Sequence, residues 1–144
     1  MDEVIYKAAN RARVALTHGG KTLVVIDGNK MAHYSDEHGL APLLTLLETD
    51  ALPPRGAVIG DRVVGRASAF LAICAGARAV YALTMADEAI DLLGGRGVLA
   101  LWGETVPYIV ERDLESRFKL DILLKDVENP AEALEIIRDY TKNT

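Results

Sequence analysis

Residues 56–82 decide the fold, and they read GAVIGDRVVGRASAFLAICAGARAVYA. A short apolar run at 57–60 precedes the polar pair Asp61-Arg62. A helix rich in small residues is expected over 64–75, and a second apolar run begins at Ala79. The pattern predicts strand, turn, helix and strand, with Asp61 and Arg62 in the turn. Because a helix start exposes unpaired N–H groups and the positive end of the helix dipole, this turn is a candidate anion site.

The rest of the chain extends this unit to an α/β fold with a mixed five-stranded sheet. Asp27-Gly28-Asn29 predicts a hairpin, and Thr84 resembles the cap of a helix. Later strands should be parallel because a helix separates each from the next. We expect strands at 23–26, 30–34, 57–60, 79–83 and 98–102, and helices at 2–18, 40–47, 64–75, 85–93, 114–124 and 130–142. All 144 residues are expected to form a single domain.

Charge and hydropathy argue against two classes of binding partner, nucleic acids and membranes. The net charge is −5 and no basic cluster occurs, which argues against binding nucleic acid. The apolar runs are too short for a membrane-spanning helix, so no membrane partner is expected. One cysteine and no visible targeting segment fit a cytoplasmic location.

Several short strings, spread over most of the chain, carry a family resemblance. The most specific is GDRVVGRASA at 60–69. The weaker ones are Asp27-Gly28, GLAPL at 39–43, VYA at 80–82, VPYI at 106–109, ERD at 111–113 and NPAEA at 129–133. Together they resemble an uncharacterised prokaryotic family with the cytidine-deaminase-like fold and no established activity. The resemblance implies a three-layer α-β-α sandwich. Members also tend to carry a cysteine shortly after the 111–113 region, which this chain lacks.

The zinc chemistry of that fold is not expected here. Zinc deaminases of this fold take His or Cys from one helix start and Cys-x-x-Cys from the next, and a Glu moves protons. This chain has no Cys-x-x-Cys and no His-x-Glu, and its one cysteine is Cys74. Catalytic zinc needs three protein ligands. We therefore expect no metal and no cofactor.

What the resemblance leaves is a pocket between two helix starts at one edge of the sheet. Two positive helix ends suit a carboxylate or phosphate, and an arginine could clamp it. The predicted ligand-binding residues are His38, Gly39, Asp61, Arg62, Gly65, Arg66, Glu111 and Arg112. Each has a plainer alternative: a polar turn at 61–62, helix packing at Gly65, a local cap at His38 and a solvated charge run at 111–113.

Two functions are consistent with these features. The first is a zinc-free deaminase-like domain that binds a small anionic or nucleotide-like ligand, with or without catalysis. The alternative is a non-catalytic structural module that self-associates, for example as a homodimer. The sequence identifies no catalytic residues.

Overall fold

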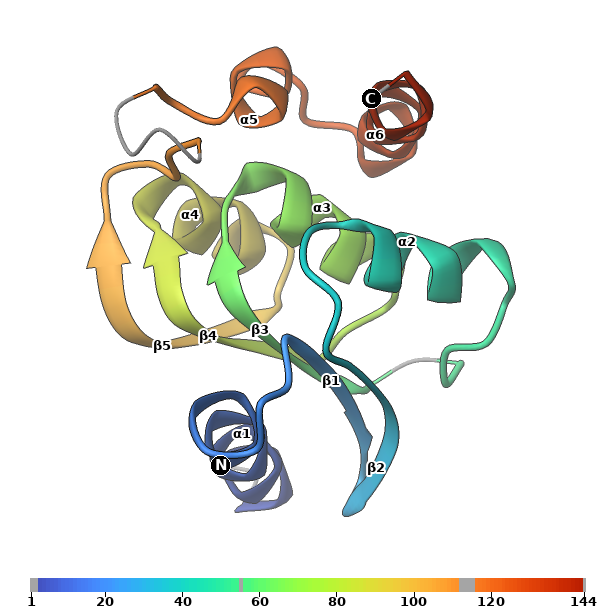
Figure 1. Ribbon diagram of the computed structural model, residues 1–144, viewed down its shortest axis with the longest axis vertical. Coiled ribbons are helices and arrows are strands. Elements are labelled where there is room, and N and C mark those ends of the chain that lie inside the picture. The colour runs from blue at the N-terminus through green and yellow to red at the C-terminus, as the bar shows by residue number, and fades with distance from the viewer. Residues whose placement is uncertain (1–2, 55, 112–115, 144) are drawn as a thin grey trace.

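The computed structural model describes residues 3–54, 56–111 and 116–143 (Figure 1). Its strands form one five-stranded sheet in the order β2-β1-β3-β4-β5. They are β1 (Leu23–Asp27), β2 (Lys30–Ser35), β3 (Val58–Val64), β4 (Ala79–Ala86) and β5 (Leu99–Val106). β1 is antiparallel to β2 and β3, whereas β3, β4 and β5 are parallel. The predicted mixed sheet and the order of elements along the chain are confirmed.

Helices cover both faces of the sheet. They are α1 (Glu3–Thr17), α2 (Ala41–Glu48), α3 (Arg66–Cys74), α4 (Asp87–Gly95), α5 (Lys119–Leu123) and α6 (Pro130–Lys142). α1 lies on one face, and α2, α3 and α4 lie on the other (Figure 1). α5 and α6 stack outside α3 and α4, beyond the three expected layers. None of the described helices is long and apolar enough to cross a membrane.

Two apolar cores hold these layers together. On the α1 face, Ala12 packs so close to Gly60 that a Cβ on Gly60 would lie 2.7 Å from the Ala12 Cβ. On the opposite face, α3 is the central helix, with Ala69, Phe70 and Leu71 fully buried. The helix rich in small residues is therefore present as predicted, and its small side chains let it approach the sheet closely.

The predicted boundaries place the ends of β3 and β4 too early. β3 continues through Asp61 and Arg62, because Val63 and Val64 pair with Thr84 and Met85 of β4. The expected turn at 61–62 is therefore strand, and α3 begins at Arg66. Thr84 is also a strand residue and caps no helix: its Oγ1 donates a hydrogen bond to Glu104 Oε1 at 3.0 Å. α4 begins after Ala86 instead.

The C-terminal region departs further from the predicted boundaries. β5 runs on to Val106 rather than ending at Trp102. Of the helix expected over 114–124, the structure has the short α5, and residues 114 and 115 lie outside the described part of the chain. Ile122 and Leu123 of α5 are 42% and 57% exposed, whereas Leu120 and the following Leu124 are buried.

Candidate functional site

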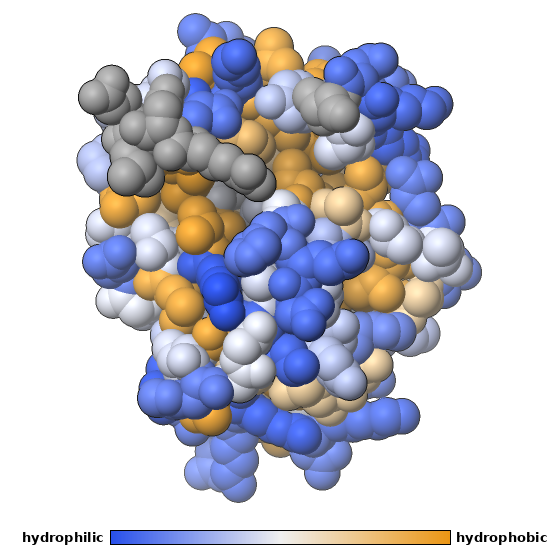
Figure 2. Space-filling model, viewed as in Figure 1, coloured by the Kyte–Doolittle hydropathy of each residue, from blue (hydrophilic) through white to orange (hydrophobic). Residues whose placement is uncertain are grey.

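A cavity of about 300 Å³ opens where the C-terminal end of β3 meets the starts of α2 and α3. Asp121 of α5, Phe118 and residues 109–111 line the far side. The lining residues are Thr22, His38, Gly39, Leu40, Asp61, Arg62, Val63, Gly65, Ser68, Ile109, Val110, Glu111, Phe118 and Asp121. The two helix starts therefore do meet at one cavity, as the topology predicts. Hydrophobic residues come to the surface below α5 and α6 in the view of Figure 2.

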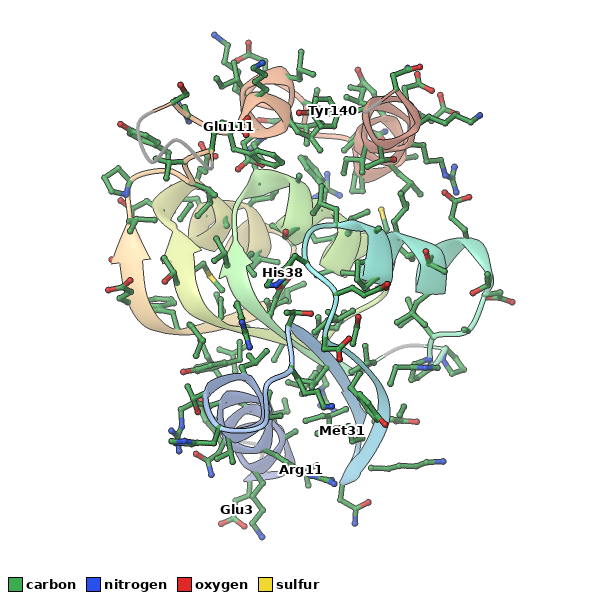
Figure 3. The ribbon with its side chains drawn as sticks, in the orientation of Figure 1. Glu3, Arg11, Met31, His38, Glu111 and Tyr140 are labelled. Carbon is green, nitrogen blue, oxygen red and sulfur yellow. The ribbon has the colours of Figure 1, made fainter. Side chains whose placement is uncertain are left out.

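Six of the eight predicted site residues line this cavity. His38 and Gly39 belong to the loop before α2, and Glu111 belongs to the segment that leads to α5 (Figure 3). The other three are Asp61, Arg62 and Gly65. Arg66 is absent from the lining, and Arg112 lies outside the described residues.

Among the acids that line the cavity, Asp61 has the pKa that is raised furthest above its ordinary value. Burial raises the pKa of its carboxyl to about 7, because the charged form loses its hydration. Hydrogen bonds from the backbone N–H groups of Arg62 and Val63 oppose that shift but do not cancel it. The Arg62 N–H donates to Asp61 Oδ1 at 2.8 Å. A carboxyl with such a pKa exchanges its proton near neutral pH, which is typical of functional acids.

Arg62 is held by the protein itself. Its side chain crosses to the turn before β1, where Nε donates to the Lys21 carbonyl oxygen at 2.9 Å. The guanidinium therefore ties β3 to that turn. Arg62 borders the cavity, but one donor of its guanidinium is already used.

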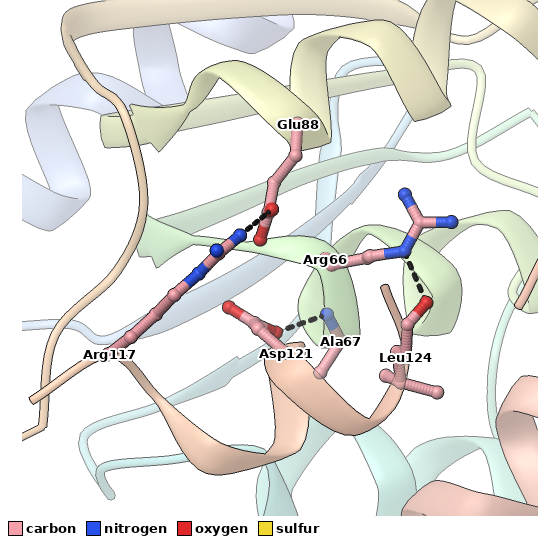
Figure 4. Close-up of polar contacts among 6 residues, drawn as sticks. All are labelled: Arg66, Ala67, Glu88, Arg117, Asp121 and Leu124. Carbon is pink, nitrogen blue, oxygen red and sulfur yellow. Dashed lines mark hydrogen bonds and ion pairs between the residues drawn. The ribbon is translucent and has the colours of Figure 1, made fainter. Parts of the chain in front are cut away.

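Arg66 makes its contacts within the protein, away from the cavity lining. Its guanidinium donates to the carbonyl oxygens of Leu124 at 2.6 Å and Val127 at 2.5 Å, and lies 5.2 Å from the Phe70 ring centroid. These contacts fasten the end of α5 to α3 (Figure 4). The prediction that Arg66 lines the pocket is wrong, because α3 begins at this residue and turns its side chain toward the outer layer.

Asp121 is the site residue that the sequence analysis missed. It is 1% exposed, and its Oδ1 accepts a hydrogen bond of 2.8 Å from the Ala67 N–H (Figure 4). Since Gly65 is the N-cap residue and offers no side chain, the carboxyl from α5 caps α3 from outside the helix. Burial raises its pKa to about 6, and the nearby negative charge of Glu88 adds to the shift.

Gly65 leaves the room that this cap needs. A Cβ at position 65 would collide with Asp121 Oδ2 and would lie 2.8 Å from Ile109 Cγ1. The plainer interpretation of Gly65, close packing at the helix start, is therefore correct, although the residue also borders the cavity.

Two acids anchor the cavity wall at residues 108–111 and 116–118. Glu88 on α4 forms an ion pair of 2.6 Å with Arg117, whose guanidinium lies 5.2 Å from the Tyr108 ring centroid. Glu111 Oε1 accepts a 2.9 Å hydrogen bond from the Lys119 N–H and so caps α5. Glu111 is thus a structural residue as well as a lining one.

The described part of the chain contains no cluster of three His, Cys, Asp or Glu side chains placed to hold a metal ion. What the cavity offers is the hydrogen-bonding chemistry of its carboxyls, beside apolar walls from Leu40, Ile109 and Phe118. Such a mixture is typical of sites for small organic molecules.

Comparisons with known proteins give the family and the fold. A DUF1893 family protein, TM1506 from Thermotoga maritima, is similar in structure with a TM-score of 0.80 at 18% identity, over 97% of this chain and 91% of that one. A diaminohydroxyphosphoribosylaminopyrimidine deaminase/5-amino-6-(5-phosphoribosylamino)uracil reductase from Thermotoga maritima gives a TM-score of 0.48 at 11% identity, over 85% of this chain and 41% of that one. No curated protein matches. Residues 11–141 match the family model TM1506, and the chain therefore belongs to this family, a domain of unknown function (DUF1893).

Proposed function

We propose that this protein binds a small nucleotide-like ligand in the cavity between the starts of α2 and α3. The observation that supports this most is Asp61, an acid with its pKa raised to about 7 by burial at the wall of that cavity. Burying a carboxyl costs stability, and such costs are concentrated at functional sites. A purely structural role would be served as well by an uncharged residue.

The shape and lining support a ligand with a planar ring. A volume of about 300 Å³ stands at the lower end of the range for small-molecule sites. Leu40, Ile109 and Phe118 offer apolar contact to the faces of a ring, and the carboxyl of Asp61 offers hydrogen bonds to its edge. A heterocyclic base joined to a sugar combines these features.

A thermal-shift screen of nucleosides, nucleotides and sugar phosphates tests the proposal. A ligand at 100 times its Kd stabilises the folded state by about 2.7 kcal/mol, which moves the Tm by several degrees. Ser68→Leu places a bulky side chain in the cavity and should abolish the shift, whereas Thr45→Leu, on the exposed face of α2, should retain it. No shift with any compound, or an equal shift in Ser68→Leu, would contradict binding at this site.

A further inference from the structure

The charged groups of the cavity do not favour an anion. Asp61, Glu111 and Asp121 all line it. Among the described basic residues expected to clamp an anion, Arg62 has its Nε committed to the Lys21 carbonyl, and Arg66 is turned outward to Leu124 and Val127. The cavity therefore has more acidic side chains than arginines that are free to bind an anion.

The start of α3 is also occupied. The Ala67 N–H, which would otherwise point to a bound anion, already donates to Asp121 Oδ1 (Figure 4). A carboxylate or phosphate entering here would displace a buried internal carboxyl and leave it without its partner. Leaving a buried acid unpaired is costly, so the helix end that suggested an anion site is filled by the protein.

Asp61 has acceptor capacity left for a ligand. An ionised carboxylate is a pure acceptor with about four lone-pair positions on two oxygens. The backbone N–H groups at 62 and 63 use part of this capacity. Asp61 lines the cavity, and a carboxylate matches a flat group that presents two neighbouring donors, because its two oxygens lie side by side.

We infer that the ligand presents to Asp61 a planar edge of two adjacent N–H donors, a ring N–H beside an amino group, as in the 2-amino-4-oxo ring of guanine. This inference rests on the proposed function and names the group recognised at the same site. An anionic edge, or one with an oxygen in place of the amino group, is rejected by the same carboxylate.

Three nucleosides with different edges provide the test. Guanosine has both donors, inosine lacks the amino group, and xanthosine carries an oxygen in its place. Binding to the wild-type protein is measured by calorimetry at pH 8, where Asp61 is mostly ionised. We expect guanosine to bind at least about tenfold more tightly than inosine, because its amino group adds a second hydrogen bond to a charged acceptor. Xanthosine should bind least.

The variant Asp61→Asn separates recognition from folding. Asparagine keeps the size and the acceptor for the Arg62 N–H, but its amide NH₂ opposes a ligand donor. The tenfold preference should disappear. Inosine binding should also weaken, because its ring N–H loses the charged acceptor, and guanosine binding should weaken by more, because it loses two such contacts. Asp91→Asn, an exposed acid on α4, is the matched control and should keep the preference.

The outcomes distinguish the two proposals. Equal affinity of the wild-type protein for guanosine and inosine, or tighter binding of xanthosine, overturns the donor-edge inference and leaves nucleoside binding intact. Binding of none of the three to the wild-type protein overturns the inference, and the wider screen above then decides the proposed function. The wild-type comparison needs no variant, so a failure of Asp61→Asn to fold does not remove the test.

Discussion

We expect Asp61→Asn to be more stable than the wild-type protein at neutral and alkaline pH, and about equally stable at acidic pH. The folded-state pKa is about 7, against 3.8 for the ordinary group. Between these values the folded state holds a proton that the unfolded state has lost, so the stability of the wild-type protein falls as pH rises from about 4 to 7. Raising the pKa from 3.8 to about 7 corresponds to a loss of roughly 4 kcal/mol in the free energy of unfolding at high pH. Because the cavity side of Asp61 keeps some contact with water, we expect about 2 kcal/mol or more.

Urea unfolding at pH 4 and at pH 8 measures this effect. Asp61→Asn and the wild-type protein should have similar free energies of unfolding at pH 4, and the variant should be more stable at pH 8. The exposed Asp91→Asn should show no such pH-dependent gain. A variant that is equally stable or less stable than the wild-type protein at pH 8 would refute the reasoning, since it would mean that the ionised carboxylate is fully compensated in the folded state.

Four further outcomes are expected. Gly65→Ala should cost about 1–3 kcal/mol in urea unfolding, because its Cβ meets Asp121 and Ile109, whereas Gly94→Ala, with open space around it, should gain up to about 1 kcal/mol. Arg66→Ala should cost about 2 kcal/mol by losing two hydrogen bonds and its ring contact, without changing ligand affinity. Asp121→Ala should cost about 1–2 kcal/mol as a lost cap, and Asp121→Asn, which keeps an acceptor for Ala67, should be milder. Elemental analysis of the purified protein should find no stoichiometric zinc; one zinc per chain would contradict the ligand argument.

The sheet and the order of its elements follow from simple signals in the sequence. Uninterrupted apolar runs mark buried strands, and Asp27-Gly28-Asn29 marks the hairpin between β1 and β2. The cap of α6 was equally readable: Asn129 Oδ1 accepts hydrogen bonds from the N–H groups of Ala131 and Glu132. In each case the signal is local, so the neighbouring residues suffice to determine the structure.

The ends of β3 and β4 could not be read in the same way. Val63, Val64, Thr84 and Met85 fit a helix start as well as a strand when each segment is considered by itself. Their pairing across the sheet decides in favour of strand, and that pairing joins residues about twenty positions apart. The later end of β3 also changes the structural context of Asp61. Asp61 is a strand residue whose backbone pairs with β1 and β4, so it is held more rigidly at the cavity wall than a turn residue would be.

The anion prediction stays a prediction, but the start of α3 shows an acceptor that the sequence analysis did not count. This helix start needs an acceptor, because Gly65 brings none of its own. The prediction takes that acceptor from a ligand, whereas the chain itself supplies Asp121, 54 residues away from Ala67. No local pattern marks Asp121, since an acid beside the buried Leu120 looks like the polar face of an amphipathic turn. Once that carboxyl is counted, the same helix end that attracts anions contributes an acid to the cavity wall. A ligand with N–H donors would satisfy these acceptors, and the donor edge that we propose at Asp61 follows from this.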